Sequence, residues 1–121
     1  MSATKLTRLT TKLDRETITG RLVWSTKPIA GLDEARAGAL FNIHEATYNG
    51  VRIRAFRGNT IILDITGVPT GSQKRNVLQF INDAGAVEWE ASDITGLDEL
   101  LETIEFKTHK IADKIDAILA A

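Results

Sequence analysis

Acidic side chains and a histidine follow one face near the C-terminus of the sequence. Glu105, His109, Asp113 and Asp116 recur at helical spacing, which could present carboxylate oxygens and an imidazole to a metal ion. The chain holds only two histidines and no cysteine, so a tight transition-metal site is not expected. A solvated helix face is the better interpretation, and we predict neither a metal site nor a cofactor.

Catalytic groups of other kinds are weakly indicated. Glu88 and Glu90 share one side of a predicted strand, but acid–base catalysis needs two environments that separate the pKa values of a carboxylate pair, and both residues are expected to be exposed. The glycine-containing segment 67–74 lacks the Gly-Lys-Ser/Thr ending of a phosphate-binding loop. No serine lies in a nucleophile elbow. We therefore predict no catalytic residues and no enzymatic activity.

A basic stripe marks the first predicted helix. Lys5, Arg8, Lys12 and Arg15 lie at helical spacing, as they would on a helix that contacts phosphates. Across the chain 15 Lys and Arg oppose 16 Asp and Glu, for a formal charge of −1, so no global field attracts nucleic acid or an anionic membrane. Nucleic-acid association through this stripe is one alternative function, and a solvated helix face is the simpler interpretation.

A second alternative is a small ligand held between sheet and helix. His44 and Tyr48 fall on the same side of one predicted strand, and Trp24 belongs to a neighbouring strand. These three residues are the candidate ligand-binding group. A half-buried structural histidine is the simpler interpretation of His44.

Two apolar stripes predict the helices. Leu6, Leu9 and Leu13 predict a helix over residues 4–17 that Gly20 can end. A longer helix over residues 96–119, with Thr95 as its N-cap, is predicted by a stripe without Gly or Pro: Leu97, Leu101, Ile104, Thr108, Ile111, Ile115 and Ile118. This helix is expected to supply most of the cover of the sheet. Truncation at Thr108 is then expected to abolish cooperative unfolding.

Turn residues divide the middle of the chain into strands. Asn49-Gly50 predicts a two-residue type I′ hairpin, which pairs His44 with Ala55 on the core face and Glu45 with Arg54 on the other. A three-residue loop is expected at 58–60, which places Leu63 and Ile65 on the core face; a flexible connection is expected at 67–72 and a last turn at 83–85. The predicted strands cover about 21–25, 39–48, 51–57, 61–66, 76–82 and 86–91.

These elements predict an α+β fold in one domain, residues 1–121. A five- to six-stranded antiparallel β-meander is packed by an N-terminal helix and a long C-terminal helix. No apolar run is long enough to span a membrane, and the first 15 residues are too polar for a signal peptide. The absence of cysteine fits a reducing compartment, and we expect a cytoplasmic protein without membrane association.

Phe106 breaks the pattern of the long helix. It lies about 160–200° from the apolar stripe, so it cannot face the sheet from the same straight helix. We expect it to contact a protein partner or a second copy of the chain, together with Val23, Ile43 and Phe56. The preferred function is therefore a non-enzymatic binding module that docks a protein partner or forms a homodimer.

Several short motifs carry a resemblance. They are Thr19-Gly20-Arg21-Leu22 before Trp24, Tyr48-Asn49-Gly50 before Arg52 and Arg54, Asp83-Ala84-Gly85, and Leu97-Asp98-Glu99-Leu100-Leu101. In their order along the chain they resemble a group of small, largely uncharacterised bacterial and phage proteins. The resemblance implies a bacterial or phage setting and a layout of helix, β-meander and helix. It implies no activity for any residue.

Overall fold

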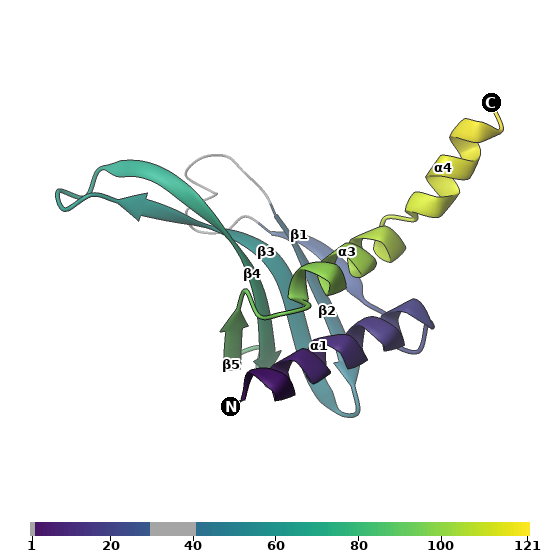
Figure 1. Ribbon diagram of the computed structural model, residues 1–121, viewed down its shortest axis with the longest axis horizontal. Coiled ribbons are helices and arrows are strands. Elements are labelled where there is room, and N and C mark those ends of the chain that lie inside the picture. The colour runs from purple at the N-terminus through teal and green to yellow at the C-terminus, as the bar shows by residue number, and fades with distance from the viewer. Residues whose placement is uncertain (1, 30–40) are drawn as a thin grey trace.

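The computed structural model describes residues 2–29 and 41–121 and has an α+β fold, as predicted. Five antiparallel strands form one sheet in the order β1-β2-β3-β4-β5. Helices α1 and α3 pack against each other across one face of this sheet (Figure 1). The elements are α1 (Ala3–Ile18), β1 (Ser25–Ile29), β2 (Phe41–Tyr48), β3 (Val51–Leu63), β4 (Pro69–Ile81), β5 (Val87–Ser92), α3 (Leu97–Thr108) and α4 (Ile111–Leu119).

The β2–β3 hairpin has the predicted turn and register. Asn49 and Gly50 have φ values of 51° and 81°, as a type I′ turn requires at both central positions. The turn pairs His44 with Ala55 and Glu45 with Arg54. The prediction of the core face is therefore confirmed. The residues 39 and 40 of the predicted strand 39–48 lie outside the described residues.

The predicted loop at 58–60 is wrong, because these residues lie inside β3 and pair with β4. The predicted strands 51–57 and 61–66 are thus parts of one strand, and most of the predicted connection 67–72 belongs to β4. The chain reverses at Asp64 instead, whose carboxylate accepts hydrogen bonds from the backbone N–H groups of Thr66 and Val68 at 2.8 and 3.0 Å. Gly67 supplies the positive φ of 84°.

The predicted strand 21–25 is also wrong, since β1 begins at Ser25. Residues 21–24 fold back on the end of α1, where the backbone N–H of Leu22 donates to the carbonyl of Glu16 at 3.0 Å. Leu22 and Trp24 both enter the core from this irregular segment. Their alternation resembles that of a strand, although the backbone does not pair there.

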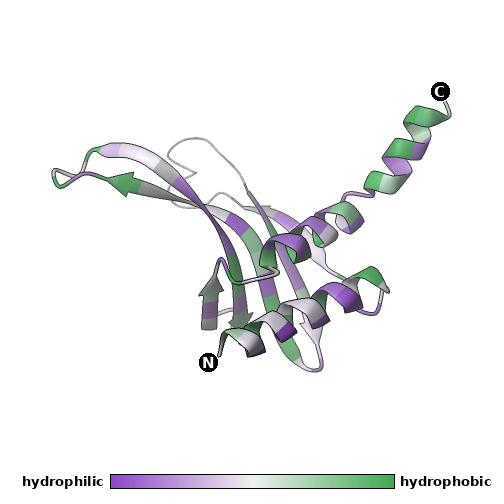
Figure 2. Cartoon of the chain, viewed as in Figure 1, coloured by the Kyte–Doolittle hydropathy of each residue, from purple (hydrophilic) through white to green (hydrophobic). Residues whose placement is uncertain are grey.

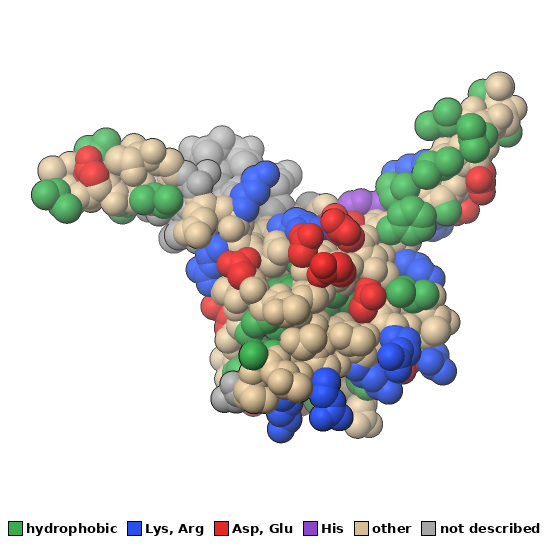
Figure 3. Space-filling model, viewed as in Figure 1, with side chains coloured by type: hydrophobic (Ala, Val, Ile, Leu, Met, Phe, Trp, Pro, Cys, Tyr) green, Lys and Arg blue, Asp and Glu red, His purple; other side chains and the backbone are tan. Residues whose placement is uncertain are grey.

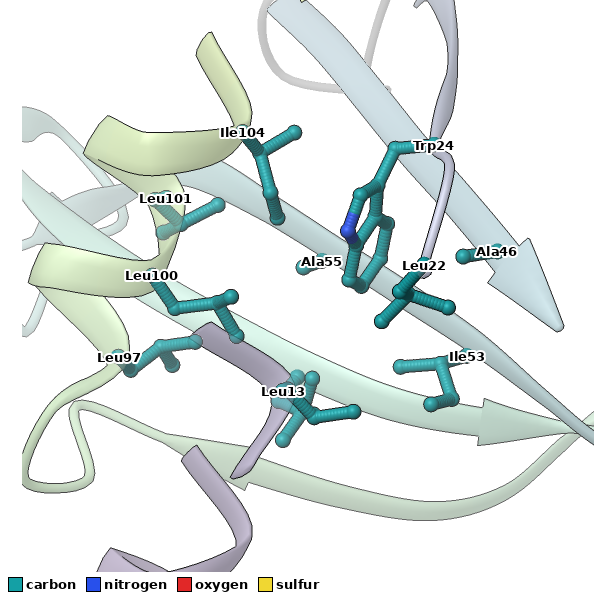
Figure 4. Close-up of a cluster of buried hydrophobic side chains, with 11 residues drawn as sticks. Leu13, Leu22, Trp24, Ala46, Ile53, Ala55, Leu97, Leu100, Leu101 and Ile104 are labelled. Carbon is teal, nitrogen blue, oxygen red and sulfur yellow. The ribbon is translucent and has the colours of Figure 1, made fainter. Parts of the chain in front are cut away.

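The core lies between the sheet and the two helices α1 and α3 (Figure 4). Its buried residues are Leu13, Leu22, Trp24, Ala46, Ile53, Ala55, Leu78, Leu97, Leu100, Leu101 and Ile104. The two helices meet closely at the start of α3: the Thr10 hydroxyl donates to the carbonyl of Thr95 at 2.8 Å. Gly96, with a φ of 85°, is the N-cap of α3, so the predicted N-cap at Thr95 is wrong.

The predicted single helix over 96–119 is wrong as well. It is interrupted at His109 and Lys110, and Lys110 adopts the left-handed conformation with a φ of 52°. Buried side chains from α3 reach the core, whereas α4 contains no buried residue. Figure 1 shows α4 extending away from the body of the fold. The sheet is therefore covered by α1 and α3, and α4 adds nothing to this cover.

Candidate interaction surfaces

Helix α4 carries an exposed apolar stripe. The exposed fractions are 47% for Ile115, 74% for Ile118 and 77% for Leu119. At about 100° per residue, these side chains and those of Ile111 and Ala112 all lie within about 60° of Ile115 on the helical wheel. Figure 2 shows these hydrophobic segments along the projecting helix. We call the five residues the α4 stripe.

The isolation of α4 makes this stripe unusual. The helix has nine residues and follows a left-handed residue, Lys110, and the element it contacts most is the preceding helix α3. Isolated helices shorter than about 12–15 residues are marginal in water, and most helices are stabilised by burying an apolar face. Within the described residues nothing buries the face of α4. A partner would supply the missing cover.

The four residues predicted to bind a partner do not lie together. Phe106 is 49% exposed on α3, and Val23 is exposed in the segment before β1. Ile43 is buried and pairs with Phe56 on β3. By strand alternation this pair lies on the face of the sheet opposite His44 and Ala55, and so away from the helices. Phe106 therefore remains a candidate contact residue without the predicted neighbours Ile43 and Phe56.

A second protrusion is the far end of the β3–β4 hairpin. Beyond the neighbouring strands, Ile62, Leu63, Ile65 and Val68 are all exposed. Leu63 and Ile65 had been expected on the core face, and that prediction is wrong. Figure 3 shows this hairpin end and α4 diverging from the body, each with hydrophobic side chains on its surface. In the sequence, the turn at the end of this hairpin is marked by Asp64 followed by Gly67.

The basic stripe of α1 is present and exposed. Lys12 lies 3.3 Å from the carboxylate of Glu16, which also accepts a hydrogen bond from Arg21 Nε at 2.6 Å. Burial acts to raise the pKa of Glu16, but its hydrogen bonds and ion pairs with Arg21 and Lys12 outweigh that effect and lower the pKa.

The other three cations of this stripe are Lys5, Arg8 and Arg15, and none of them forms an ion pair with another described residue. In the view of Figure 3, blue side chains gather over α1 and red ones over α3. The two helices therefore present opposite charges on the same layer of the fold.

The candidate ligand-binding residues are mainly part of the core. His44 is buried, and its Nδ1 forms a hydrogen bond with the Thr26 hydroxyl at 2.7 Å. Trp24 Nε1 donates to the Thr17 hydroxyl at 2.9 Å, and Tyr48 packs against the core cluster. These contacts give His44 and Trp24 structural roles.

Three charged or titratable residues, Glu105, His109 and Arg57, influence the buried His44 electrostatically. Burial lowers the pKa of His44; the charge of Glu105 opposes this, and His109 and Arg57 reinforce it. Arg57 Nε donates to Glu105 at 2.7 Å and its Nη1 to Asp98 at 2.6 Å. Burial alone would lower the pKa of Arg57, but these two carboxylates raise it. The two ion pairs of Arg57 therefore tie β3 to α3.

The His, Asp and Glu side chains considered as metal ligands are not grouped in the structure. The break at Lys110 separates Glu105 and His109 from Asp113 and Asp116. Across residues 2–29 and 41–121, no three His, Asp or Glu side chains are grouped as metal ligands. Glu90 accepts a hydrogen bond from Gln79 Nε2 at 2.7 Å, and Glu88 is exposed.

Comparisons with known proteins give no relative. The chain matches no protein-family model, and no curated protein or solved structure shows significant similarity to it. Among the described helices, none is both long enough and apolar enough to cross a membrane.

Proposed function

We propose that this protein is a non-enzymatic docking module, of bacterial or phage origin, that binds a protein partner or another copy of itself through α4. The observation that supports this most is the α4 stripe on a helix with no buried residue. An exposed apolar face on a projecting element is a common feature of protein-binding surfaces. Phe106, at the end of α3 nearest to α4, can add to the same contact.

The exposed area sets the strength of such a contact. Fully burying an isoleucine or leucine side chain contributes about 1.5–3 kcal/mol. Given their exposed fractions, Ile115, Ile118 and Leu119 together would contribute roughly 3–6 kcal/mol from this side of an interface. The loss of translational and rotational freedom costs about 4–15 kcal/mol. We therefore expect a weak or transient complex unless the partner adds further contacts.

Site-specific photocrosslinking in the producing cell tests this proposal. A benzophenone amino acid replaces Ile118 in the α4 stripe or, as the matched control, Asp113. The two positions lie on opposite sides of α4, since Asp113 and Ile118 are about 140° apart on the helical wheel. We expect protein adducts from position 118 and few from position 113. Equal yields from both positions, or none from either, would contradict the docking role of α4.

Nucleic-acid binding by α1 is a second candidate, supported by the exposed cations Lys5, Arg8 and Arg15. Four phosphate contacts, including Lys12, should give a slope of roughly −3 to −4 for log affinity against log salt. Fluorescence anisotropy with a labelled duplex across a salt series measures this slope. Arg8→Ala should reduce its magnitude by about one. Absence of binding at low salt would exclude this candidate.

A further inference from the structure

The turn between β2 and β3 places an asparagine directly before a glycine. The side-chain carbonyl carbon of an asparagine, Cγ, can be attacked by the backbone nitrogen of the next residue, and glycine crowds that nitrogen least. Asn49 and Gly50 are both exposed, and a Cβ added to Gly50 would lie in open space. The side chain of Asn49 forms no hydrogen bond with another described residue. Its amide is therefore free to react.

The other asparagines whose side chains the structure describes differ from Asn49. Oδ1 of Asn76 accepts a hydrogen bond from an arginine at 3.2 Å, and Oδ1 of Asn82 accepts two from backbone N–H groups at 3.0 and 2.9 Å. Asn42 is exposed, but its neighbour Ile43 has a branched Cβ that crowds the attacking nitrogen. Of these four residues, Asn49 alone combines a free side chain with a following glycine.

The reaction at this turn needs only the chain and water. A base removes the proton of the Gly50 N–H, and the nitrogen attacks Cγ of Asn49. The new N–Cγ bond closes a five-membered succinimide ring, and the Cγ–Nδ2 bond breaks as Nδ2 takes up a proton and leaves as ammonia. Water then opens the ring at either carbonyl carbon and leaves aspartate or isoaspartate. No electrons are exchanged, so no oxidant or reductant is required.

The turn must open before this ring can close. The type I′ turn holds both central residues at positive φ, whereas ring closure needs rotation about the Cα–C bond of Asn49. The end of the hairpin is suited to such opening, because Val51 is 42% exposed and Tyr48 is only partly buried. Segments with few buried contacts open at a low cost in free energy. The reaction therefore proceeds from molecules whose hairpin end has opened transiently.

We infer that Asn49 is a modification site, where the side-chain amide is lost spontaneously to give a mixture of aspartate and isoaspartate. The two products differ in their effect on the fold. Aspartate before glycine still suits a type I′ turn, so that product keeps the hairpin. Isoaspartate adds a carbon to the backbone, so the two-residue turn that pairs Tyr48 with Val51 is lost. Its formation loosens this end of β2 and β3.

Peptide mapping by mass spectrometry, on the purified full chain incubated in mildly alkaline buffer, measures the reaction. Replacement of –NH2 by –OH raises the mass of the peptide that contains residue 49, and chromatography separates its aspartate and isoaspartate forms. We expect both products at position 49. Conversion at Asn42, the exposed control, should be at least about tenfold slower, because Ile43 crowds the attacking nitrogen.

Gly50→Ala is the matched variant. Its methyl group crowds the attacking nitrogen, while strain at a φ of 81° loosens the turn. A looser turn alone would speed the reaction, so slower conversion in this variant identifies the nitrogen of residue 50 as the attacking group. Asn49→Asp keeps the turn and is the second variant. It should release no ammonia from this position but should still accumulate isoaspartate.

Three results would overturn the inference. Absence of conversion at position 49 in the folded chain, with conversion in urea, would show that the turn protects Asn49 completely. Equal rates at Asn42 and Asn49 would show that the following glycine has no role. Unchanged or faster conversion in Gly50→Ala, or no isoaspartate in Asn49→Asp, would exclude attack by the nitrogen of residue 50.

Discussion

Removing α4 is expected to leave the rest of the fold intact. A chain that ends at His109 keeps the last hydrogen bond of α3, from the His109 N–H to the carbonyl of Glu105 at 3.0 Å. It loses no buried side chain, and Ile111 is the one residue of α4 that is half-buried rather than exposed. Half-burial of an isoleucine contributes about 1 kcal/mol. We therefore expect the free energy of unfolding to fall by no more than about 1 kcal/mol.

The matched comparison is Leu101→Ala in α3. Leu101 is fully buried in the core, and such a truncation costs about 2–5 kcal/mol. Thermal and urea unfolding, followed by circular dichroism at a concentration where the chain is monomeric, measures both variants. The melting temperature should fall by less than about 5 °C without α4 and by roughly 10–20 °C in Leu101→Ala. If loss of α4 lowers it as much as Leu101→Ala does, or abolishes the cooperative transition, α4 is part of the folded body and our description of it is wrong.

Three further predictions concern the folded body. Gly96→Ala should destabilise it by at least about 2 kcal/mol in urea unfolding, because a Cβ there would lie 2.5 Å from the Thr10 hydroxyl at a φ of 85°. Gly50→Ala, in open space at a φ of 81°, should cost only about 1 kcal/mol in the same assay, and a larger loss than at Gly96 would contradict the close packing there. Because burial lowers the pKa of His44, the unfolded chain takes up its proton first, so stability should fall as the pH drops from about 6.5 towards the lower pKa of the folded state. His44→Gln should flatten that part of a pH–stability curve. An unchanged slope would show that the titration of His44 does not cause the loss of stability.

Turn chemistry allowed the β2–β3 register to be predicted from the sequence. Few residue pairs adopt positive φ at both centres of a two-residue turn, and Asn49-Gly50 is one of them. Once that turn is fixed, strand alternation places His44 and Ala55 on the core face. The basic stripe of α1 followed in the same way, since a helix with a clear apolar face defines its exposed face as well.

The second hairpin was mispredicted because two turn signals compete within a few residues. Gly58-Asn59 offers backbone freedom alone, whereas Asp64 offers side-chain oxygens that accept hydrogen bonds from the reversing backbone. The structure places the turn at Asp64, and Gly58 lies within β3. The prediction chose the loop that would bury Leu63 and Ile65. In the structure these residues lie on a protruding hairpin end, where a rule based on burial inside one chain does not apply.

The assumption that apolar residues are buried within one chain also caused the separate helix α4 to be missed. The spacing of apolar residues shows which of them share a face of a helix, but it does not show what covers that face. In the part of the predicted apolar pattern that lies on α3, Leu97, Leu101 and Ile104 are buried against the sheet and α1. The part on α4 keeps the same spacing although α4 projects from the rest of the fold. The sequence-based prediction assigned both parts to one core. Phe106 was predicted to lie outside the core because it does not share the apolar face of the helix. The larger set of apolar residues outside the core is the α4 stripe, whose spacing suits a contact between two chains as well as it suits a core.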